Sequence, residues 1–317
     1  MTQTFEPASD AAEPDEVVEL VASADSATAE LSDGLGRRAR FRVSLREFMR
    51  NEKLGVASAI VILVIIFAAL FADVVAPKDP IFQHRSNFLE GPSGEFLLGT
   101  DDLGRDIFSR ILFGARVSLL VGGVTILVST VLGTALGIVS GYLGKWVDLI
   151  TQRIVDAVMS IPVLILALFI VALFGTGVNI VILALSIVYI PRFARIARGE
   201  MLRVRESDYV DAAQALGSGA MRVMWRHGLP NITAPIIIMA SLTFGQAIIA
   251  EAALSFLGLG TPPPDPSWGR MLAESQAWMQ IAWWMVVFPG VAIALAVLAF
   301  NLLGDALRDH FDPKLVR

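Results

Sequence analysis

The stretch from Ser207 to Pro230 reads S-D-Y-V-D-A-A-Q-A-L-G-S-G-A-M-R-V-M-W-R-H-G-L-P and decides how the rest of the chain is interpreted. An apolar helical face precedes the break at Gly217 and Gly219, and a second one follows it. The first face consists of Val210, Ala213 and Leu216, and the second of Met221, Met224 and Trp225. We therefore predict two short helices joined by a glycine break and lying against a membrane surface. Small residues beside the break permit a partner's side chains to approach closely.

Taken alone, this stretch leaves three interpretations open: a filler loop, a DNA-reading motif and a site where a protein docks. DNA reading is disfavoured because the duplex would have to lie against the bilayer. The arginines also flank the two helices at the membrane boundary, rather than lining one exposed face. We retain protein docking, with filler as the simpler alternative.

The composition indicates that lipid is the solvent for most of the chain. Of the 317 residues, 55% are hydrophobic and 17% are charged, whereas soluble domains carry about 25% charged residues. A bilayer core of about 30 Å requires about 20 apolar residues of helix. The charge-poor runs that reach this length are Leu54–Ala72, Val117–Gly144, Gly228–Ala250 and Ser275–Gly304.

A further uncharged run, Ala157–Pro191, is too long for one crossing and short for two. Gly175-Thr176-Gly177 lies in its middle and supplies a tight turn. Both arms become long enough if the first starts as early as Leu149 and the second continues to Ala197. We therefore predict a helical hairpin here, and six crossings in all.

The distribution of basic residues supports an even number of crossings. Six crossings place nineteen Lys and Arg residues in the cytoplasm and six outside, whereas five crossings place ten inside and fifteen outside. Because cytoplasmic loops carry the excess of Lys and Arg, we expect six crossings with both termini in the cytoplasm.

This topology divides the chain into segments with different solvents. The segments are a disordered acidic cytoplasmic tail (1–36), a basic juxtamembrane or interfacial segment (37–53), a first transmembrane helix (54–76), an extracytoplasmic loop (77–113), a core with five further crossings (114–305) that contains the inner loop at about 192–230, and a cytoplasmic tail (306–317). Seven basic residues in 37–53 suit a helix in the headgroup layer, or equally a plain segment that sets orientation.

Catalytic and metal-binding signals are missing from the sequence. The chain has no cysteine, and its three histidines (His84, His227 and His310) lie far apart. It has no Gly-x-x-x-x-Gly-Lys-Ser/Thr phosphate loop and no Gly-x-Ser-x-Gly elbow. We expect no catalytic residue, no metal and no cofactor in this chain, so energy for any transport must come from a partner.

Three residues within the predicted crossings are candidates for a gate or a pathway: Asp156, Pro162 and Glu251. A charge at mid-bilayer costs about 2.5–3.5 kcal/mol on insertion scales, so a carboxylate there must have either a stabilising partner or a functional role. The structural alternative is that Glu251 hydrogen-bonds to the Trp268 loop, that Asp156 pairs with an arginine, and that Pro162 is a helix kink.

Within the inner loop, Asp211-Ala212-Ala213, Gly217 and Leu229-Pro230 have the spacing of the EAA loop of ATP-binding-cassette importer permeases, with Asp in place of the usual Glu. Over about residues 41–317 the chain resembles the C-type permease subunit of the dipeptide, oligopeptide and nickel importers. The other stretches that carry this resemblance are Ala76–Pro80, Leu98–Asp106, Ser109–Arg110, Gly114–Leu119, Leu254–Gly260 and Ser267–Gly269. Asp211 and Gly228 depart from the expected pattern.

The resemblance implies an all-α polytopic membrane protein with the type I ABC importer permease fold and a coupling helix between the fourth and fifth crossings. It implies a heterodimer with a second related permease, two ABC ATPase subunits that bind the ATP, and an extracytoplasmic substrate-binding protein. It places the chain in the bacterial inner membrane, among lipid and without nucleic acid. The six EAA-like residues Asp211, Ala212, Ala213, Gly217, Leu229 and Pro230 would couple it to the ATPases.

Peptides are the expected cargo, with nickel or another small solute as the alternative. A secondary transporter driven by an ion gradient would require an intramembrane carboxylate relay, which the sequence does not show. A scaffold that only recruits soluble partners is a further alternative.

Overall fold

Long uncharged runs in the sequence fold into helices. The structure, a computed structural model, describes residues 48, 50 and 52–311, and no strand forms among them. The predicted tail 1–36, most of the segment 37–53 and the last residues, 312–317, lie outside the described part. The helices are α3 (Lys53–Leu70), α4 (Ala72–Val75), α5 (Ile107–Leu143), α6 (Lys145–Met159), α7 (Val163–Phe174), α8 (Val178–Arg205), α9 (Asp208–Ala215), α10 (Ala220–Arg222), the π-helical turn η1 (Val223–Gly228), α11 (Leu229–Phe256), α12 (Trp268–Ser275), the 3₁₀ turn η2 (Gln276–Trp278) and α13 (Trp284–Phe311).

Among these residues, five helical stretches are long and apolar enough to cross a membrane: α3, α5, α8, the run from α10 to α11, and α13. A sixth span results if α6 and α7 count as one, although they meet at a bend of 91°. Pro162 stands at this bend as the residue before α7, where the missing N–H of proline ends a helix. The six predicted crossings therefore correspond to five continuous spans and one broken span.

The predicted Gly-Thr-Gly turn separates α7 from α8. Gly175 and Gly177 both have positive φ, +97° and +130°, a conformation that glycine adopts at little cost. Two boundaries differ from the prediction. The first crossing ends as α3 at Leu70, followed by the short α4, and α5 begins at Ile107 rather than near residue 114.

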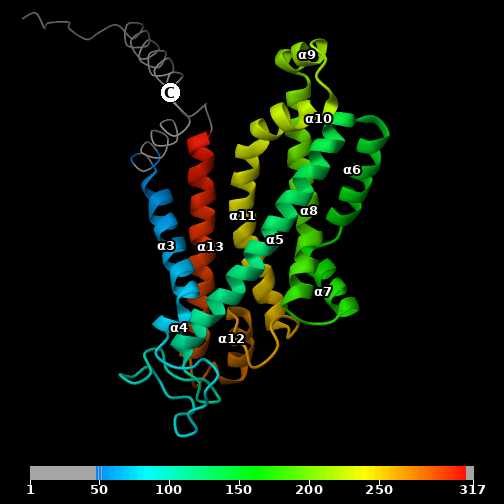
Figure 1. Ribbon diagram of the computed structural model, residues 1–317. Coiled ribbons are helices and arrows are strands. Elements are labelled where there is room, and N and C mark those ends of the chain that lie inside the picture. The colour runs from blue at the N-terminus through cyan, green and yellow to red at the C-terminus, as the bar shows by residue number, and fades with distance from the viewer. Residues whose placement is uncertain (1–47, 49, 51, 312–317) are drawn as a thin grey trace, which may run out of the picture. The chain divides into compact units, whose positions relative to one another are not determined.

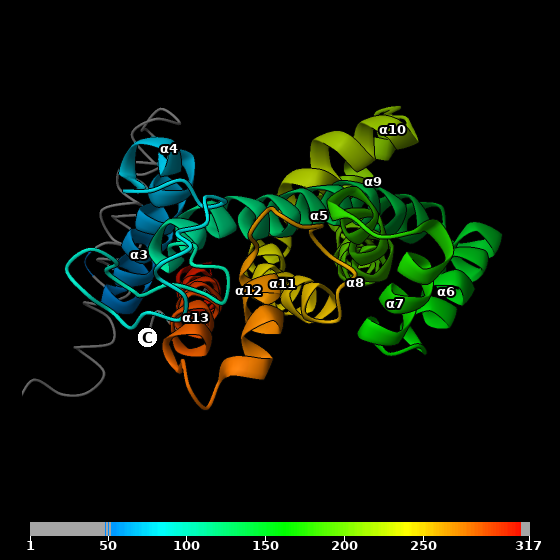
Figure 2. The ribbon, with the colours of Figure 1, turned by 90° about the horizontal axis from the view of Figure 1, so that it is seen from below.

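The longest helix pair, α5 and α8, packs along a seam of glycines. Gly133, Gly137 and Gly141 recur every four residues on α5, and a Cβ atom on any of them would lie less than 3.0 Å from a backbone oxygen of α8. Small residues at this spacing let two membrane helices approach to backbone contact. On the other side of this pair, α11 lies between α8 and α13 and also contacts α5 (Figures 1 and 2).

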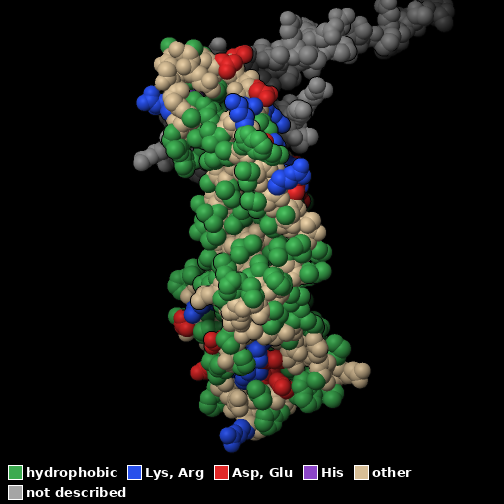
Figure 3. Space-filling model, turned by 90° about the vertical axis from the view of Figure 1, so that its right-hand side faces the viewer, with side chains coloured by type: hydrophobic (Ala, Val, Ile, Leu, Met, Phe, Trp, Pro, Cys, Tyr) green, Lys and Arg blue, Asp and Glu red, His purple; other side chains and the backbone are tan. Residues whose placement is uncertain are grey.

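The loops gather at two opposite ends of the helical unit that begins at Leu54. Residues 77–106 and α12 lie at one end, and α9 lies at the other, together with the start of α3 and the end of α13 (Figure 1). One face shows mostly hydrophobic side chains between charged groups near both ends (Figure 3). Leu63, Phe169 and Leu173 are among the exposed apolar side chains, which a lipid environment would cover.

Candidate functional site

The inner loop, residues 206–219, joins the end of α8 to α10 and contains α9. Helix α9 ends in a Schellman motif: Ser218 N donates to Ala213 O and Gly217 N donates to Gln214 O, both at 2.9 Å. Gly217 has φ +85° and open space around its Cα. The backbone conformation, rather than a neighbouring side chain, therefore requires glycine at position 217.

A single apolar side chain anchors α9 to the rest of the protein. Val210 is fully buried and packs in the same core cluster as Val204, Val223 and Met224. Two polar contacts add to this anchor: Asn231 Nδ2 donates to the Tyr209 hydroxyl at 3.2 Å, and Gln214 Nε2 reaches the Tyr142 hydroxyl at 3.5 Å. Helix α9 is therefore attached to the rest of the protein mainly through Val210.

The rest of the inner loop and the turn after it expose apolar and basic side chains. Leu216 is 88% exposed and Trp225 is 60% exposed. Arg222 and Arg226 are exposed, and neither has an ion-pair partner among the described residues. An apolar surface with unpaired cations beside it is incomplete on its own and marks a site for a partner.

The predicted coupling residues fall into two groups around this surface. Asp211, Ala212 and Gly217 are exposed on α9 and its end, and Ala213 is half-buried beside them. Leu229 and Pro230 lie at the first turn of α11, with Pro230 exposed. The predicted second short helix is wrong as a separate element, because α10 continues through η1 into α11.

Helix α8, on one side of the inner loop, is firmly held. Arg198 donates to both carboxylate oxygens of Asp148 on α6, at 2.5 and 2.6 Å, and Ser140 of α5 donates to the same carboxylate at 2.7 Å. Arg205 Nη1 donates to the carbonyl oxygens of Gly141 and Tyr142. These contacts and the glycine seam join α5, α6 and α8 at the end that carries α9.

On the other side of the inner loop, the connection is irregular. Residues Val223–Gly228 form a π-helical turn, a geometry that appears mostly as single turns at functional sites. A Cβ at Gly228 would lie 2.7 Å from Met201 Sδ of α8. Because the contacting atoms are the end of the flexible Met201 side chain, a larger residue at Gly228 would require that side chain to move, and the contact alone does not require glycine here.

The inner loop is shorter than predicted. The sequence placed its start at about residue 192, but α8 continues to Arg205. The arginines in this last part of α8 are stable in the helix because Asp148 and Asp156 of α6 neutralise two of them. Asp156 Oδ1 lies 2.6 Å from Arg195 Nη2, with both side chains about half exposed.

The other two candidate gate residues lie in different surroundings. Pro162 stands at the bend between α6 and α7. Glu251 is fully buried in α11, where Ser118 of α5 and Ser255 donate to its carboxylate at 3.0 and 2.7 Å. Ser267, at the start of α12, also hydrogen-bonds to this carboxylate. The inner loop, the α6–α7 bend and Glu251 thus form three separate places in the fold.

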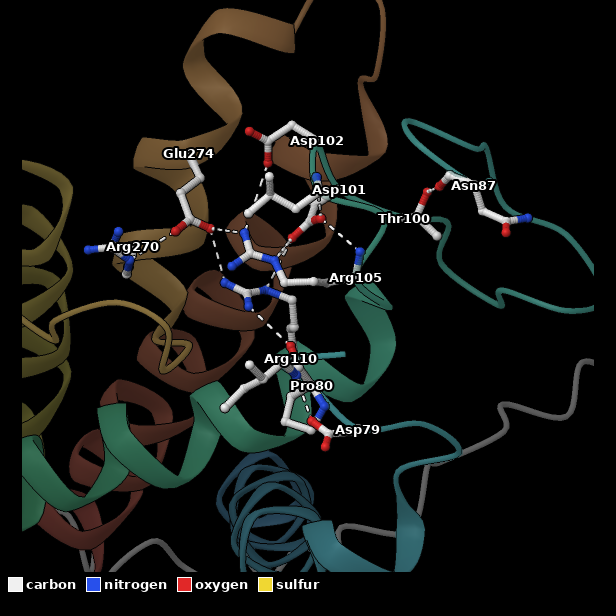
Figure 4. Close-up of polar contacts among 12 residues, drawn as sticks. Asp79, Pro80, Asn87, Thr100, Asp101, Asp102, Arg105, Arg110, Arg270 and Glu274 are labelled. Carbon is white, nitrogen blue, oxygen red and sulfur yellow. Dashed lines mark hydrogen bonds and ion pairs between the residues drawn. The ribbon is translucent and has the colours of Figure 1, made fainter. Parts of the chain in front are cut away.

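The structure also reveals a polar cluster that the sequence did not predict, in the outer cap, which we define as residues 77–106 and α12. Glu274 of α12 accepts from Arg105, Arg110 and Arg270 at 3.0, 3.0 and 2.9 Å (Figure 4). Asp101 also accepts from Arg105, at 2.6 Å. Arg110 is only 1% exposed. The Asp101–Arg105 and Arg270–Glu274 pairs are local, four residues apart, but the local sequence does not reveal the contact of Glu274 with Arg110, which lies 164 residues away.

Asp102 lies at the edge of this outer cluster. Its Oδ1 atom is buried without a hydrogen-bond partner, and the nearest cation, Arg105 Nη2, is 3.9 Å away. Burial raises the pKa of the Asp102 carboxyl above its ordinary value, and the neighbouring Asp101 carboxylate raises it further. Within the described residues, no group of three or more His, Asp and Glu side chains is arranged to hold a metal ion.

Comparisons with known proteins give one consistent result. Residues 133–317 match the family described as binding-protein-dependent transport system inner membrane component. Residues 40–92 match the N-terminal TM domain of oligopeptide transport permease C.

Three relatives are similar over most of their length. The dipeptide transport system permease protein DppC of Alkalihalophilus pseudofirmus is 43% identical over 275 residues, covering 87% of this chain and 90% of that protein. The protein of the same name from Escherichia coli is 46% identical over 274 residues, covering 84% and 91%. The glutathione transport system permease protein GsiD of Pectobacterium atrosepticum is 43% identical over 279 residues, covering 86% and 92%.

Proposed function

Because the chain belongs to the family of binding-protein-dependent transport system inner membrane components, we propose that it is one membrane-spanning subunit of an ATP-driven importer of short peptides. The relatives are named for dipeptide and glutathione transport, which favours peptides over nickel or other solutes. The exposed surface of α9 is the observation that carries the proposal, since it is an incomplete surface at one end of the spans.

Two separate ATPase subunits would bind ATP, and one of them would dock on α9. The exposed Leu216 and the unpaired Arg222 and Arg226 support this assignment, because a partner can bury the first and pair with the others. A second, related permease would complete the pathway. Among the described residues, most Lys and Arg lie toward the ATPase end, where α3 begins and α13 ends, which supports placing this end, and with it both termini, in the cytoplasm.

An extracytoplasmic binding protein would deliver the peptide to the outer cap. The cap's internal ion pairs support this role, because a surface whose own charges are already paired keeps its shape when a second protein binds and leaves.

Closure of the ATPases would move α9 and, with it, the joined helices α5, α6 and α8. The glycine seam and the Arg198–Asp148 pair favour their movement as one body. The π-helical turn Val223–Gly228 supplies a weaker joint toward α11, so α11 can change its angle to α8 when α9 is pushed. Rigid-body movement about such a joint is a common form of domain rearrangement.

The test is a Gly217→Trp variant in the complete importer. At φ +85° the tryptophan strains the end of α9 and fills the docking surface, so we expect normal membrane insertion, loss of ATPase pull-down and loss of peptide uptake. Gly217→Asn should retain most uptake, because asparagine tolerates this conformation.

Gly219→Trp separates side-chain bulk from backbone strain. Gly219 has an ordinary φ of −71°, and no neighbouring atom lies within 4 Å of the position that a Cβ would take. Its tryptophan therefore adds volume without strain, two residues from Gly217. We expect the Gly219→Trp variant to retain part of the ATPase binding of the wild type. Wild-type uptake and pull-down with Gly217→Trp would rule out α9 as the docking site.

A further inference from the structure

An apolar groove with two arginines at one end lies on the face formed by α8, α11 and α13. It has a volume of about 400 Å³. Its lining consists of Ile196, Arg203, Ala234, Pro235, Ile238, Met239, Leu242, Arg308 and Phe311. Among the described residues, the lining includes two arginines and no carboxylate. Arg203 pairs with Glu200 beside the groove at 3.3 Å, while Arg308 has no carboxylate partner among the described residues.

The groove continues toward a third arginine. Arg192 precedes Ile196 by one helical turn on α8, and Gln246 follows Leu242 by one turn on α11, so both extend the faces that line the groove. Arg192 Nη1 donates to Gln246 Oε1. The Arg192 guanidinium also lies 5.3 Å from the centre of the Tyr189 ring.

Arg192 differs from its neighbours on α8 because its charge is not neutralised. Arg195 and Arg198 each pair with a carboxylate of α6, whereas the polar partner of Arg192 is an uncharged amide. A half-buried cation in a membrane-spanning helix is costly unless an anion or water accompanies it, and such residues mark the paths of solutes and ions.

The position of Arg192 along α8 admits two sources of an anion. It lies close to the midpoint of the 28-residue helix α8, about 20 Å from either end at a rise of 1.5 Å per residue. Arg192 is the first charged residue after the uncharged run Val178–Pro191, so it lies where this run ends toward Arg195 and Arg198. A solute that leaves the groove toward the cytoplasm passes this position, whereas a lipid headgroup reaches it from the bilayer surface; the vesicle experiment below separates the two sources.

We propose that this groove is part of the peptide pathway and that Arg192, oriented by Gln246, receives the terminal carboxylate of the peptide as it crosses. This inference rests on the proposed peptide import. The carboxylate exchanges part of its hydration for the guanidinium, and the apolar walls accept peptide side chains without holding them tightly. Arg203 and Arg308 then attract the same carboxylate toward the cytoplasmic end.

The experiment measures dipeptide uptake by the complete importer in proteoliposomes, with saturating loaded binding protein, together with ATP hydrolysis. For Arg192→Gln we expect the maximal uptake rate to fall at least about tenfold, while stimulation of ATP hydrolysis by the loaded binding protein persists. Arg192→Lys should recover part of the uptake. Gln246→Ala should give an intermediate loss, because the charge remains but loses its orientation.

The matched control is Arg195→Gln, which removes the same charge from the next turn of α8, where Asp156 already pairs with it. We expect its uptake to stay within about twofold of wild type. Uptake by Arg192→Gln equal to wild type would overturn the inference while leaving peptide import established. Absence of ATP-dependent uptake by the wild-type complex would instead overturn the proposed function itself.

Two other occupants of the groove give different results. If an anionic lipid occupied it, wild-type uptake in vesicles of phosphatidylcholine alone would fall as far as uptake by Arg192→Gln in vesicles with phosphatidylglycerol. If a carboxylate of the second permease paired with Arg192, then Arg192→Gln and Gln246→Ala would weaken co-purification of the two permeases. Either result would overturn the inference, and unchanged assembly with full activity in phosphatidylcholine supports it.

Discussion

The outer cap and the inner loop use charged residues in opposite ways. Arg105 of the outer cap and Arg110, near the start of α5, are buried and share the carboxylate of Glu274. At the inner loop, Arg222 and Arg226 are exposed and have no ion-pair partner among the described residues. Leu216 is almost fully exposed, and Val210 is the one buried side chain of α9. The charged groups of the cap are therefore paired within the protein, whereas the inner loop exposes groups that a partner would have to pair or bury. The difference indicates which end of the protein depends on a permanent partner.

The largest effect should come from removing the shared carboxylate of the outer cap. Glu274→Ala leaves three arginines without their common partner, and breaking a buried ion pair costs about 3–5 kcal/mol. We expect the lower end of this range, because Asp101 remains near Arg105 and Arg110. Thermal unfolding of the purified protein in detergent measures the loss.

The matched control in the cap is Glu95→Gln. Glu95 pairs with Lys78 at 3.4 Å but is 68% exposed, so its removal should cost no more than about 0.5 kcal/mol. Equal losses for Glu274→Ala and Glu95→Gln would contradict the description of the cap as a buried, internally paired structure.

In the inner loop, the corresponding variant is Val210→Ala, with a smaller and more local effect. Removing two buried methyl groups costs about 1.5 kcal/mol, and this loss falls on the one apolar contact of α9. We expect amide hydrogen exchange to speed up in Asp208–Ala215 while the spans stay protected. Exchange that rises equally across α8 and α9 would show that α9 is not a separately anchored element.

The sequence predicts features that depend on neighbouring residues and misses those that depend on residues far apart in the chain. Spans such as α3 and α13 follow from local hydropathy, and the turn at Gly217 follows from local glycine chemistry. The end of α8 does not, because counting charges along the chain places Arg195 and Arg198 in a loop. Their partners on α6 allow the helix to continue to Arg205.

The contacts that Glu274 makes with Arg105 and Arg110 lie beyond local patterns, unlike the i,i+4 pairs Asp101–Arg105 and Arg270–Glu274. Arg105 and Glu274 are 169 residues apart, and although Leu98–Asp106 carries part of the family resemblance, nothing in that stretch identifies Glu274 as the partner of Arg105. The break between α6 and α7 is an intermediate case: Pro162 predicts a kink, but a bend of 91° depends on how both helices pack against α8.

A third variant, Leu216→Ser, separates binding from folding. Leu216 is exposed, so the free energy of unfolding should change by less than about 0.5 kcal/mol. Truncating a residue that anchors an interface costs more than about 1 kcal/mol of binding, so we expect ATPase binding to weaken at least about fivefold. Leu97→Ser, at an exposed apolar position of the outer cap, should leave ATPase binding unchanged; weakening by both variants would remove the distinction between the two ends.

The smallest effect, and a gain, should come from Asp102→Asn at the edge of the outer cluster. Burial raises the pKa of Asp102 in the folded protein, so the folded state holds this proton more tightly than the unfolded state does. Between the ordinary pKa and the raised one, stability therefore falls as pH rises. Asparagine cannot ionise, so the variant should unfold at a slightly higher temperature than wild type at pH 7 and show no such gain near pH 3. A loss of stability at pH 7 would instead mean that the Asp102 carboxylate supports Arg105 across their 3.9 Å separation, and that the cap is paired right to its edge.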